Sequence, residues 1–216
     1  MENKNNYYSK TRLEIFDLIP KKNNQNILEI GCGYGYTLKK LKEDGYASFT
    51  MGIEKNKKCQ NKALQNKIDY FICDDVENVK DQINKSFDVI LFLDVLEHLV
   101  EPWDLFKEIS KLLNKNGIII ISLPNIRNLS IIYKLIFKGT WDYQEYGILD
   151  KTHLRFFTDK SIRSNIKLYT PNLVIEDYFR NYDKLNFKKY WFKFIPGLKD
   201  FITCQFIYKI TLNENN

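Results

Sequence analysis

Two histidines are the only imidazoles in the chain, and both stand where chemistry is plausible. His98 closes the stretch D-V-L-E-H at residues 94–98, and His153 lies in YGILDKTHLRFFTD at residues 146–159. An imidazole titrates near neutral pH and exchanges protons readily. His153 therefore has two main readings: a general base in a cleft, or a buried histidine that bonds a backbone carbonyl. His98 has a similar pair of readings, a group near the reacting atoms or a brace for its loop.

A run of glycines forms a second candidate site, in the stretch E-I-G-C-G-Y-G at residues 29–35. Gly31, Gly33 and Gly35 permit a tight turn and a close approach of backbone to ligand. The dinucleotide fingerprint G-x-G-x-x-G would need a glycine where this chain has Tyr36. The spacing favours a nucleoside ligand without a pyrophosphate and disfavours a nicotinamide oxidoreductase. The alternative is a turn that needs glycine only for packing.

Acidic side chains follow three other apolar runs. Glu54 is suited to accept hydrogen bonds from ribose hydroxyls, as acids at this place do in nucleotide-binding α/β folds. Asp74 or Asp75 could accept from the amine of an adenine while the backbone N–H of Val76 donates to the ring. We prefer Asp75, because Asp74 stands where a small residue would fit. Asp94 ends the next run. The alternative for such an acid is a solvated strand end, but the distance of Glu54 from the glycine loop favours the functional reading.

Alternating strands and helices are needed to bring these residues together. Apolar runs predict strands, and amphipathic segments predict helices, from residue 26 to about residue 137. The helix 102–117 is predicted to end at Gly117, and the strand after it to begin there. This alternation predicts a parallel sheet with helices on both faces and a ligand site beyond the carboxyl ends of the strands. Residues 7–20 read as an amphipathic helix, and 173–182 and 201–212 as an antiparallel pair at the sheet edge.

Composition narrows the class of partner. The net charge of +6 is mild and interspersed, which favours an anionic small molecule and gives no nucleic-acid footprint. No N/D-P-P-Y follows the fourth strand, which also disfavours an enzyme that modifies nucleic-acid bases. The four cysteines form no C-x-x-C pair, and no leader or bilayer-length apolar run is present, so a cytoplasmic location is expected. No H-x-H or H-E-x-x-H spacing appears, so no metal site is expected.

The chain resembles the class I S-adenosylmethionine-dependent methyltransferases in ILEIGCGYGYTLKKLK, Glu54, DDVE and FDVILFLDVLEHLVEPW. The later stretch SLPNIRNLSIIYKLIFKGTWDYQEYGILDKTHLRFFT is similar to the branch found in bacterial surface-polysaccharide biosynthesis. The resemblance implies a Rossmann-like fold, with a mostly parallel sheet and an antiparallel C-terminal strand. It also implies one domain over 1–216, with an N-terminal helix (1–20), a cofactor-binding core (26–125), a substrate lid (126–165) and terminal strands (166–216).

The resemblance implies roles for individual residues. Those expected to hold S-adenosylmethionine are Arg12, Glu29, Gly31, Cys32, Gly33, Gly35, Glu54, Asp74, Asp75, Val76 and Asp94. Arg12 would pair with the cofactor carboxylate, and Asp94 would lie near its amino group. The lid is expected to wall off water and bind the acceptor through Trp141, Tyr143, Tyr146, His153 and Arg155, together with Phe156 and Phe157. The candidate catalytic residues are His153 as base, with His98 and Asp94 as rivals on one helical face.

The expected activity is transfer of a methyl group to oxygen on a capsule- or lipopolysaccharide-type precursor. The alternative acceptor is a quinone or phenol. A non-catalytic binding module is a further alternative, disfavoured by the intact acid and glycines. The basic, aromatic C-terminal stretch 188–210 favours a loop and core strand over contact with a membrane surface. Either a monomer or a homodimer fits the sequence.

Overall fold

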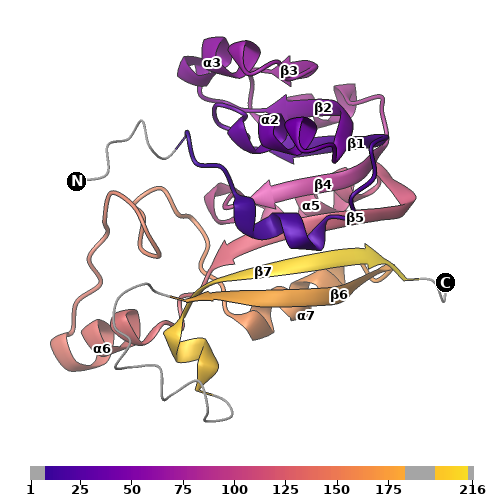
Figure 1. The fold of residues 1–216 in the computed structure, drawn as a ribbon. Coiled ribbons are helices and arrows are strands. Elements are labelled where there is room, and N and C mark those ends of the chain that lie inside the picture. Colours follow the sequence, from indigo (N-terminus) through magenta and orange to yellow (C-terminus); the bar gives the residue numbers. More distant parts are fainter. Residues whose placement is uncertain (1–7, 183–197, 214–216) are drawn as a thin grey trace.

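A computed structural model of the chain describes residues 8–182 and 198–213. Seven strands form one sheet in the order β3-β2-β1-β4-β5-β7-β6 (Figure 1). β1 to β5 run parallel, and β7 runs antiparallel to both of its neighbours. The strands are β1 Gln25–Ile30, β2 Ala47–Ile53, β3 Tyr70–Ile72, β4 Phe87–Leu93, β5 Leu113–Pro124, β6 Leu173–Tyr182 and β7 Thr203–Leu212. The expected parallel sheet with an antiparallel terminal pair is confirmed.

Helices cover both faces of the sheet. One face carries η1 Leu13–Leu18, α2 Tyr36–Glu43, η2 Lys57–Cys59 and α3 Gln60–Gln65. The other carries α4 Val76–Val79, η3 Lys80–Gln82, η4 Leu96–His98, α5 Pro102–Ser110 and α7 Asp159–Tyr169. α6 Leu129–Lys138 and η6 Lys199–Ile202 lie beyond the carboxyl end of β5.

The central strands are apolar throughout because both of their faces are buried. In β4, Ile90 and Phe92 belong to the core under α5 and α7, whereas Val89 and Leu91 belong to the core under α2. Side chains alternate between the two sides of a strand, so one continuous apolar run fills both cores. Because β1, β2 and β4 run parallel, their carboxyl ends lie at the same edge of the sheet.

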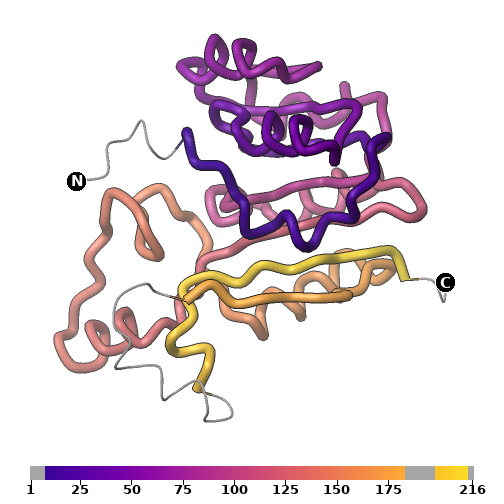
Figure 2. Tube along the Cα trace, in the orientation of Figure 1, coloured from indigo at the N-terminus to yellow at the C-terminus, as the bar shows by residue number. Residues whose placement is uncertain are grey.

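The N-terminal segment differs from the expected helix of residues 1–20. Among the described residues, only the short 3-10 helix η1 forms there. The chain before it is held on the glycine turn, because Tyr8 O accepts from Tyr34 N at 3.0 Å. Arg12 N donates to Thr37 Oγ1 at 3.2 Å. These contacts hold the segment in a non-helical path across the sheet edge (Figure 2).

The boundary between α5 and β5 also differs from the prediction. α5 ends at Ser110, and β5 begins at Leu113, so Gly117 lies inside a strand instead of ending a helix. Leu113 is buried and pairs with Phe87 of β4, and Asn114 Nδ2 donates to Asp88 Oδ1 at 2.7 Å. Pairing with β4 outweighs the helical pattern of this segment.

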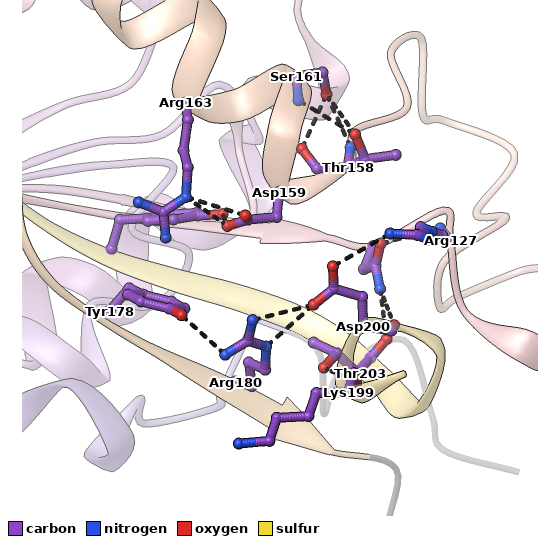
Figure 3. Close-up of polar contacts among 12 residues, drawn as sticks. Arg127, Thr158, Asp159, Ser161, Arg163, Tyr178, Arg180, Lys199, Asp200 and Thr203 are labelled. Carbon is purple, nitrogen blue, oxygen red and sulfur yellow. Dashed lines mark hydrogen bonds and ion pairs between the residues drawn. The ribbon is translucent and has the colours of Figure 1, made fainter. Parts of the chain in front are cut away.

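The sequence reading missed α7, and the expected boundary at residue 165 falls inside it. A capping box starts this helix: Thr158 Oγ1 accepts from Ser161 N at 3.2 Å, and Ser161 Oγ accepts from Thr158 N at 2.9 Å (Figure 3). Ile162 and Ile166 then pack into the core. The spacing of Thr158 and Ser161 was the available signal for a helix start.

A polar network joins β6, η6 and the segment after β5; we call it the Asp200 network (Figure 3). Asp200 Oδ1 accepts from Arg180 Nε at 3.2 Å and from Arg180 Nη2 at 3.1 Å. Arg127 Nη1 lies 3.5 Å from Asp200 Oδ2, and Arg180 Nη1 donates to Tyr178 Oη at 3.0 Å. Each carboxylate oxygen of Asp200 therefore faces a guanidinium.

Candidate functional site

The glycine turn lies between β1 and α2 and beneath the N-terminal segment. Gly31 and Gly33 have φ values of +69° and +54°, which disfavour other residues. A Cβ on Gly33 would lie 2.9 Å from Tyr8 O, and one on Gly31 would lie 2.6 Å from Val95 Cγ2. Close packing therefore accounts for part of the glycine pattern, and the turn keeps the tight geometry that was predicted.

Glu54 reaches the glycine turn from the end of β2. Its Oε2 accepts from Gly33 N at 3.0 Å, and its Oε1 accepts from Asn56 N at 2.8 Å. Each carboxylate oxygen keeps a second lone pair for a further donor. Glu54 is therefore held rigidly beside the turn and retains acceptor capacity for ligand hydroxyls.

Glu29 is buried at the end of β1. Its Oε2 has no hydrogen-bond partner within the described part of the chain. Burial raises the pKa of Glu29 from 4.5 to about 8, although Arg12 opposes this. A buried carboxyl with an unused oxygen suits a site that receives a donor from a ligand.

Arg12 and Asp94 form an ion pair across the strand ends. Arg12 Nη1 lies 2.6 Å from Asp94 Oδ2, and Arg12 Nε lies 2.5 Å from Glu14 Oε1. Burial alone would lower the pKa of Arg12, but the facing carboxylates raise it above its ordinary value. Arg12 thus faces carboxylates of the chain itself, and its pairing with a cofactor carboxylate stays a prediction.

The carboxylate of Asp94 is likewise occupied by the protein. Its Oδ1 accepts from Ser122 Oγ at 2.9 Å and also from Gln205 Nε2. Its backbone has φ of +59°, so it does not share a helical face with His98, contrary to the prediction. η4 begins only at Leu96. Asp94 therefore acts as an anchor that joins β4, β5 and β7.

The remaining predicted cofactor residues divide into turn and core positions. Asp75 caps α4 by accepting from Glu77 N at 3.1 Å, and exposed Asp74 accepts from Asn78 Nδ2 at 3.0 Å. Val76 is buried, and as the first residue of α4 its N–H has no partner within the helix. Cys32 faces the core beside Gly52, and burial raises the pKa of its thiol well above the ordinary value. Among these residues, only the Asp74–Val76 turn offers polar groups at the edge.

A cluster not expected from the sequence lies directly after β4; we call Glu97, His98 and His153 the Glu97 cluster. One side-chain ligand atom from each lies within 4.8 Å of the others. His153 Nε2 is 3.9 Å from Glu97 Oε1, and the imidazole rings meet edge-on with centroids 4.7 Å apart. Glu97 is only 1% exposed, and its Oε2 has no partner within the described ranges.

Backbone pairing brings the cluster together. Glu97 O accepts from both Leu154 N and Arg155 N, at 2.8 and 3.0 Å. These bonds hold residues 146–158 against the loop after β4, at the carboxyl ends of the strands (Figure 1). The imidazole of His153 thus reaches a carboxylate that lies far from it in sequence.

The hydrogen bonds of the two histidines determine their tautomers. His153 Nδ1 lies 3.1 Å from Ile148 O, and His98 Nδ1 lies 3.2 Å from Thr152 O. A carbonyl oxygen only accepts, and the Thr152 hydroxyl, 3.1 Å from His98 Nδ1, donates its hydrogen to Asp150 Oδ1. Nδ1 therefore carries the hydrogen in both rings, and Nε2 of each neutral ring carries a lone pair. Burial, and then the neighbouring His153, lower the pKa of His98, which favours its neutral form.

The lid side chains meet the prediction only in part. Trp141 packs edge-on against Phe156 at 5.4 Å, and Phe157 packs into the core against Trp103. Tyr143 and Tyr146 are 56% and 58% exposed, so they do not form the expected wall. Arg155 Nη2 donates to Val100 O at 2.5 Å and braces the loop after β4; its expected contact with the acceptor stays a prediction.

A family model described as a methyltransferase domain matches residues 2–168. The chain belongs to this family. The class I methyltransferase fold expected from the sequence is confirmed. The solved structures that the chain resembles include methyltransferases crystallised with S-adenosylhomocysteine.

The chain spans about half the length of the curated relatives that it matches. A ubiquinone biosynthesis O-methyltransferase of Pelagibacter ubique is 35% identical over 119 residues, covering 52% of this chain and 48% of the relative. The enzyme of the same name from Neisseria meningitidis serogroup A is 26% identical over 137 residues, covering 56% and 57%. These relatives match the phenolic alternative better than the polysaccharide acceptor, which stays a prediction.

Solved structures share the fold of the methyltransferase at low identity. The plantazolicin methyltransferase BamL, in complex with a desmethyl analogue and S-adenosylhomocysteine, has a TM-score of 0.64 at 16% identity, covering 88% of this chain and 77% of that one. A methyltransferase described as SAM-dependent from Archaeoglobus fulgidus has a TM-score of 0.64 at 16% identity, covering 93% and 91%. None of the helices in the described ranges has the length and apolar character needed to cross a bilayer.

Proposed function

We propose that the chain is an S-adenosylmethionine-dependent O-methyltransferase whose acceptor is a hydroxyl of a quinone-type or phenolic ring. The observation that supports oxygen as the methyl-accepting atom is the Glu97 cluster. Its lone pairs, beside the loop after β4, suit the activation of a hydroxyl. An amine acceptor would need only positioning. The names of the curated relatives support an aromatic ring over a sugar precursor.

The residues at the strand ends fit the nucleoside cofactor. Glu54 keeps acceptor capacity beside the glycine turn, and the Asp74–Val76 turn presents two carboxylates and a helix-end N–H for the base. Buried Glu29 offers an unused oxygen to the cationic methionine end. When bound, the cofactor supplies the activated methyl group; the protein supplies orientation and excludes water.

The direct test combines binding and turnover. Calorimetry of the full chain is expected to show binding of S-adenosylhomocysteine and not of NAD, and Glu54→Gln should weaken it about 10-fold. Release of S-adenosylhomocysteine should then occur with catechols or hydroxylated quinones, and not with nucleotide-sugars. Turnover only with nucleotide-sugars would return the acceptor to the polysaccharide class, and binding of NAD alone would remove the methyltransferase assignment.

Location and surface contacts are part of the same proposal. The structure shows all four cysteines as thiols, which supports a reducing, cytoplasmic setting. Residues 188–197 of the basic stretch 188–210 lie outside the described residues. In the final strand of that stretch, Tyr208 is buried in the core. A small-molecule acceptor reaching the Glu97 cluster from water needs no such contact.

A further inference from the structure

We propose that Glu97, His98 and His153 bind a divalent transition-metal ion, in an arrangement of two imidazoles and one carboxylate. The ligand atoms come from the loop after β4 and from the lid. They lie within 4.8 Å of one another, which is close to the span of a metal's coordination shell. Such a ligand set suits Zn²⁺ and the ions that replace it, and leaves coordination positions open.

The tautomers are those of metal ligands. Both imidazoles donate Nδ1–H to a backbone carbonyl, Ile148 O for His153 and Thr152 O for His98. Metal-binding histidines characteristically donate their second ring nitrogen in this way, which fixes the ring and increases the basicity of the ligating nitrogen. Asp150 extends the support, because Thr152 Oγ1 donates to Asp150 Oδ1 at 2.7 Å.

The carboxylate supplies a second, independent indication. Glu97 is buried, and its Oε2 lacks a partner among the described residues. His153 Nε2, at 3.9 Å, is too far from Oε1 for a direct hydrogen bond. The carboxyl group of Glu97 thus has one oxygen without a partner and the other facing the His153 ring, and a cation bound by both residues satisfies it.

The cluster needs only a small adjustment to close on an ion. Zn–N and Zn–O distances of ~2.0–2.2 Å place ligands on a tetrahedral ion ~3.4 Å apart. A separation of 4.8 Å must therefore shorten by about 1.4 Å, which rotation of the half-exposed His98 ring can supply.

A function for the ion rests on the proposed O-methyl transfer. An open coordination position would bind the acceptor hydroxyl and lower its pKa, so that the proton is lost to water. The acceptor oxygen then forms the C–O bond, the S–C bond of the sulfonium breaks, and the electron pair returns to sulfur. His153 is then a ligand instead of the base expected from the sequence.

The test uses metal binding without cofactor or acceptor, so that its failure leaves the methyltransferase proposal intact. The untagged full chain, stripped with chelator, is titrated with Co²⁺ and followed by its visible absorption, with Mg²⁺ as a comparison. The two histidines are the only imidazoles present, so each variant removes an identifiable ligand. His98→Ala, His153→Ala and Glu97→Gln should each weaken Co²⁺ binding by at least about 10-fold.

Exposed Glu101→Gln is the matched control and should bind Co²⁺ as the unaltered chain does. His98→Ala and Glu97→Gln keep the assay readable if loss of the buried His153 ring prevents folding. Binding of one Co²⁺ that needs both imidazoles supports the site. No Co²⁺ binding, or binding unchanged in the His98 and Glu97 variants, overturns it.

Discussion

The Asp200 network and the Glu97 cluster are both built from ionisable side chains in contact with loops, yet their bonding differs. In the Asp200 network both carboxylate oxygens face guanidinium groups (Figure 3). In the Glu97 cluster a buried carboxylate oxygen is left without a partner in the described part of the chain, as is one in Glu29. Saturated polar groups contribute to stability, whereas unsatisfied buried ones cost stability and are retained where a ligand completes them.

The largest effect is expected at Glu97. Replacement by Gln removes the ionisable carboxyl group with little change in shape, so turnover should fall about 10²-fold or more. The unfolding free energy should change by no more than about 1 kcal/mol, because burial raises the pKa of Glu97 well above its ordinary value and a neutral carboxyl is replaced by a neutral amide. Release of S-adenosylhomocysteine and urea denaturation measure the two quantities.

Glu108→Gln provides the control for Glu97, since this acid is exposed on α5 and pairs with Lys111. It should change neither quantity appreciably. A Glu97→Gln enzyme with full turnover and lower stability would place Glu97 with the structural acids and erase the contrast with Asp200.

Glu29 extends the comparison to pH. Its pKa is about 8 in the folded chain and 4.5 in the unfolded one, so between these values only the folded state keeps the proton. Stability should therefore fall as pH rises through this window, by at most ~1.4 kcal/mol per pH unit. In Glu29→Gln this contribution disappears and the profile flattens. Urea denaturation at pH 5 to 8 compares the two chains; parallel profiles would contradict the raised pKa.

Asp200→Asn should have the opposite signature to Glu97→Gln. It removes the charge that faces Arg180 and Arg127, so the unfolding free energy should fall by about 1–2 kcal/mol. Affinity for S-adenosylhomocysteine should stay unchanged. Glu176→Gln is the matched control, because its pair with Lys209 is half-exposed and contributes little. Equal losses in both variants would show that the Asp200 network adds nothing beyond a surface pair.

The same contrast explains which features the sequence could reveal. The strands β1 and β4 and the glycine turn follow from apolar runs and residue types that act locally. Glu54 was expected at the ligand edge of the sheet and lies there beside the glycine turn, because β2 pairs with β1; its ribose role stays a prediction. Local pattern misplaced the end of α5, where pairing of Leu113 with β4 decides the backbone.

The Glu97 cluster was beyond reach of the sequence for a physical reason. Its members come from two segments that are held together by hydrogen bonds distant in sequence, such as those from Leu154 N and Arg155 N to Glu97 O. No spacing within either segment encodes that contact, so the expectation of no metal site rested on motifs that require neighbouring ligands. The ion pair of Arg12 with Asp94 was likewise not foreseen, because the two residues approach each other only across the folded sheet edge.

The smallest effect is expected at the start of α7, which joins the lid to the side of the molecule that holds the Asp200 network. Thr158→Ala removes one half of the capping box, so the unfolding free energy should fall by about 1 kcal/mol. The lid is also tied by Ile126 N, which donates to Phe157 O at 2.9 Å, so the Glu97 cluster should stay in place. Turnover and Co²⁺ binding at low temperature should therefore match the unaltered chain. A loss of Co²⁺ affinity in this variant would show that the cap also positions the ligands, and that the two regions are coupled through the lid.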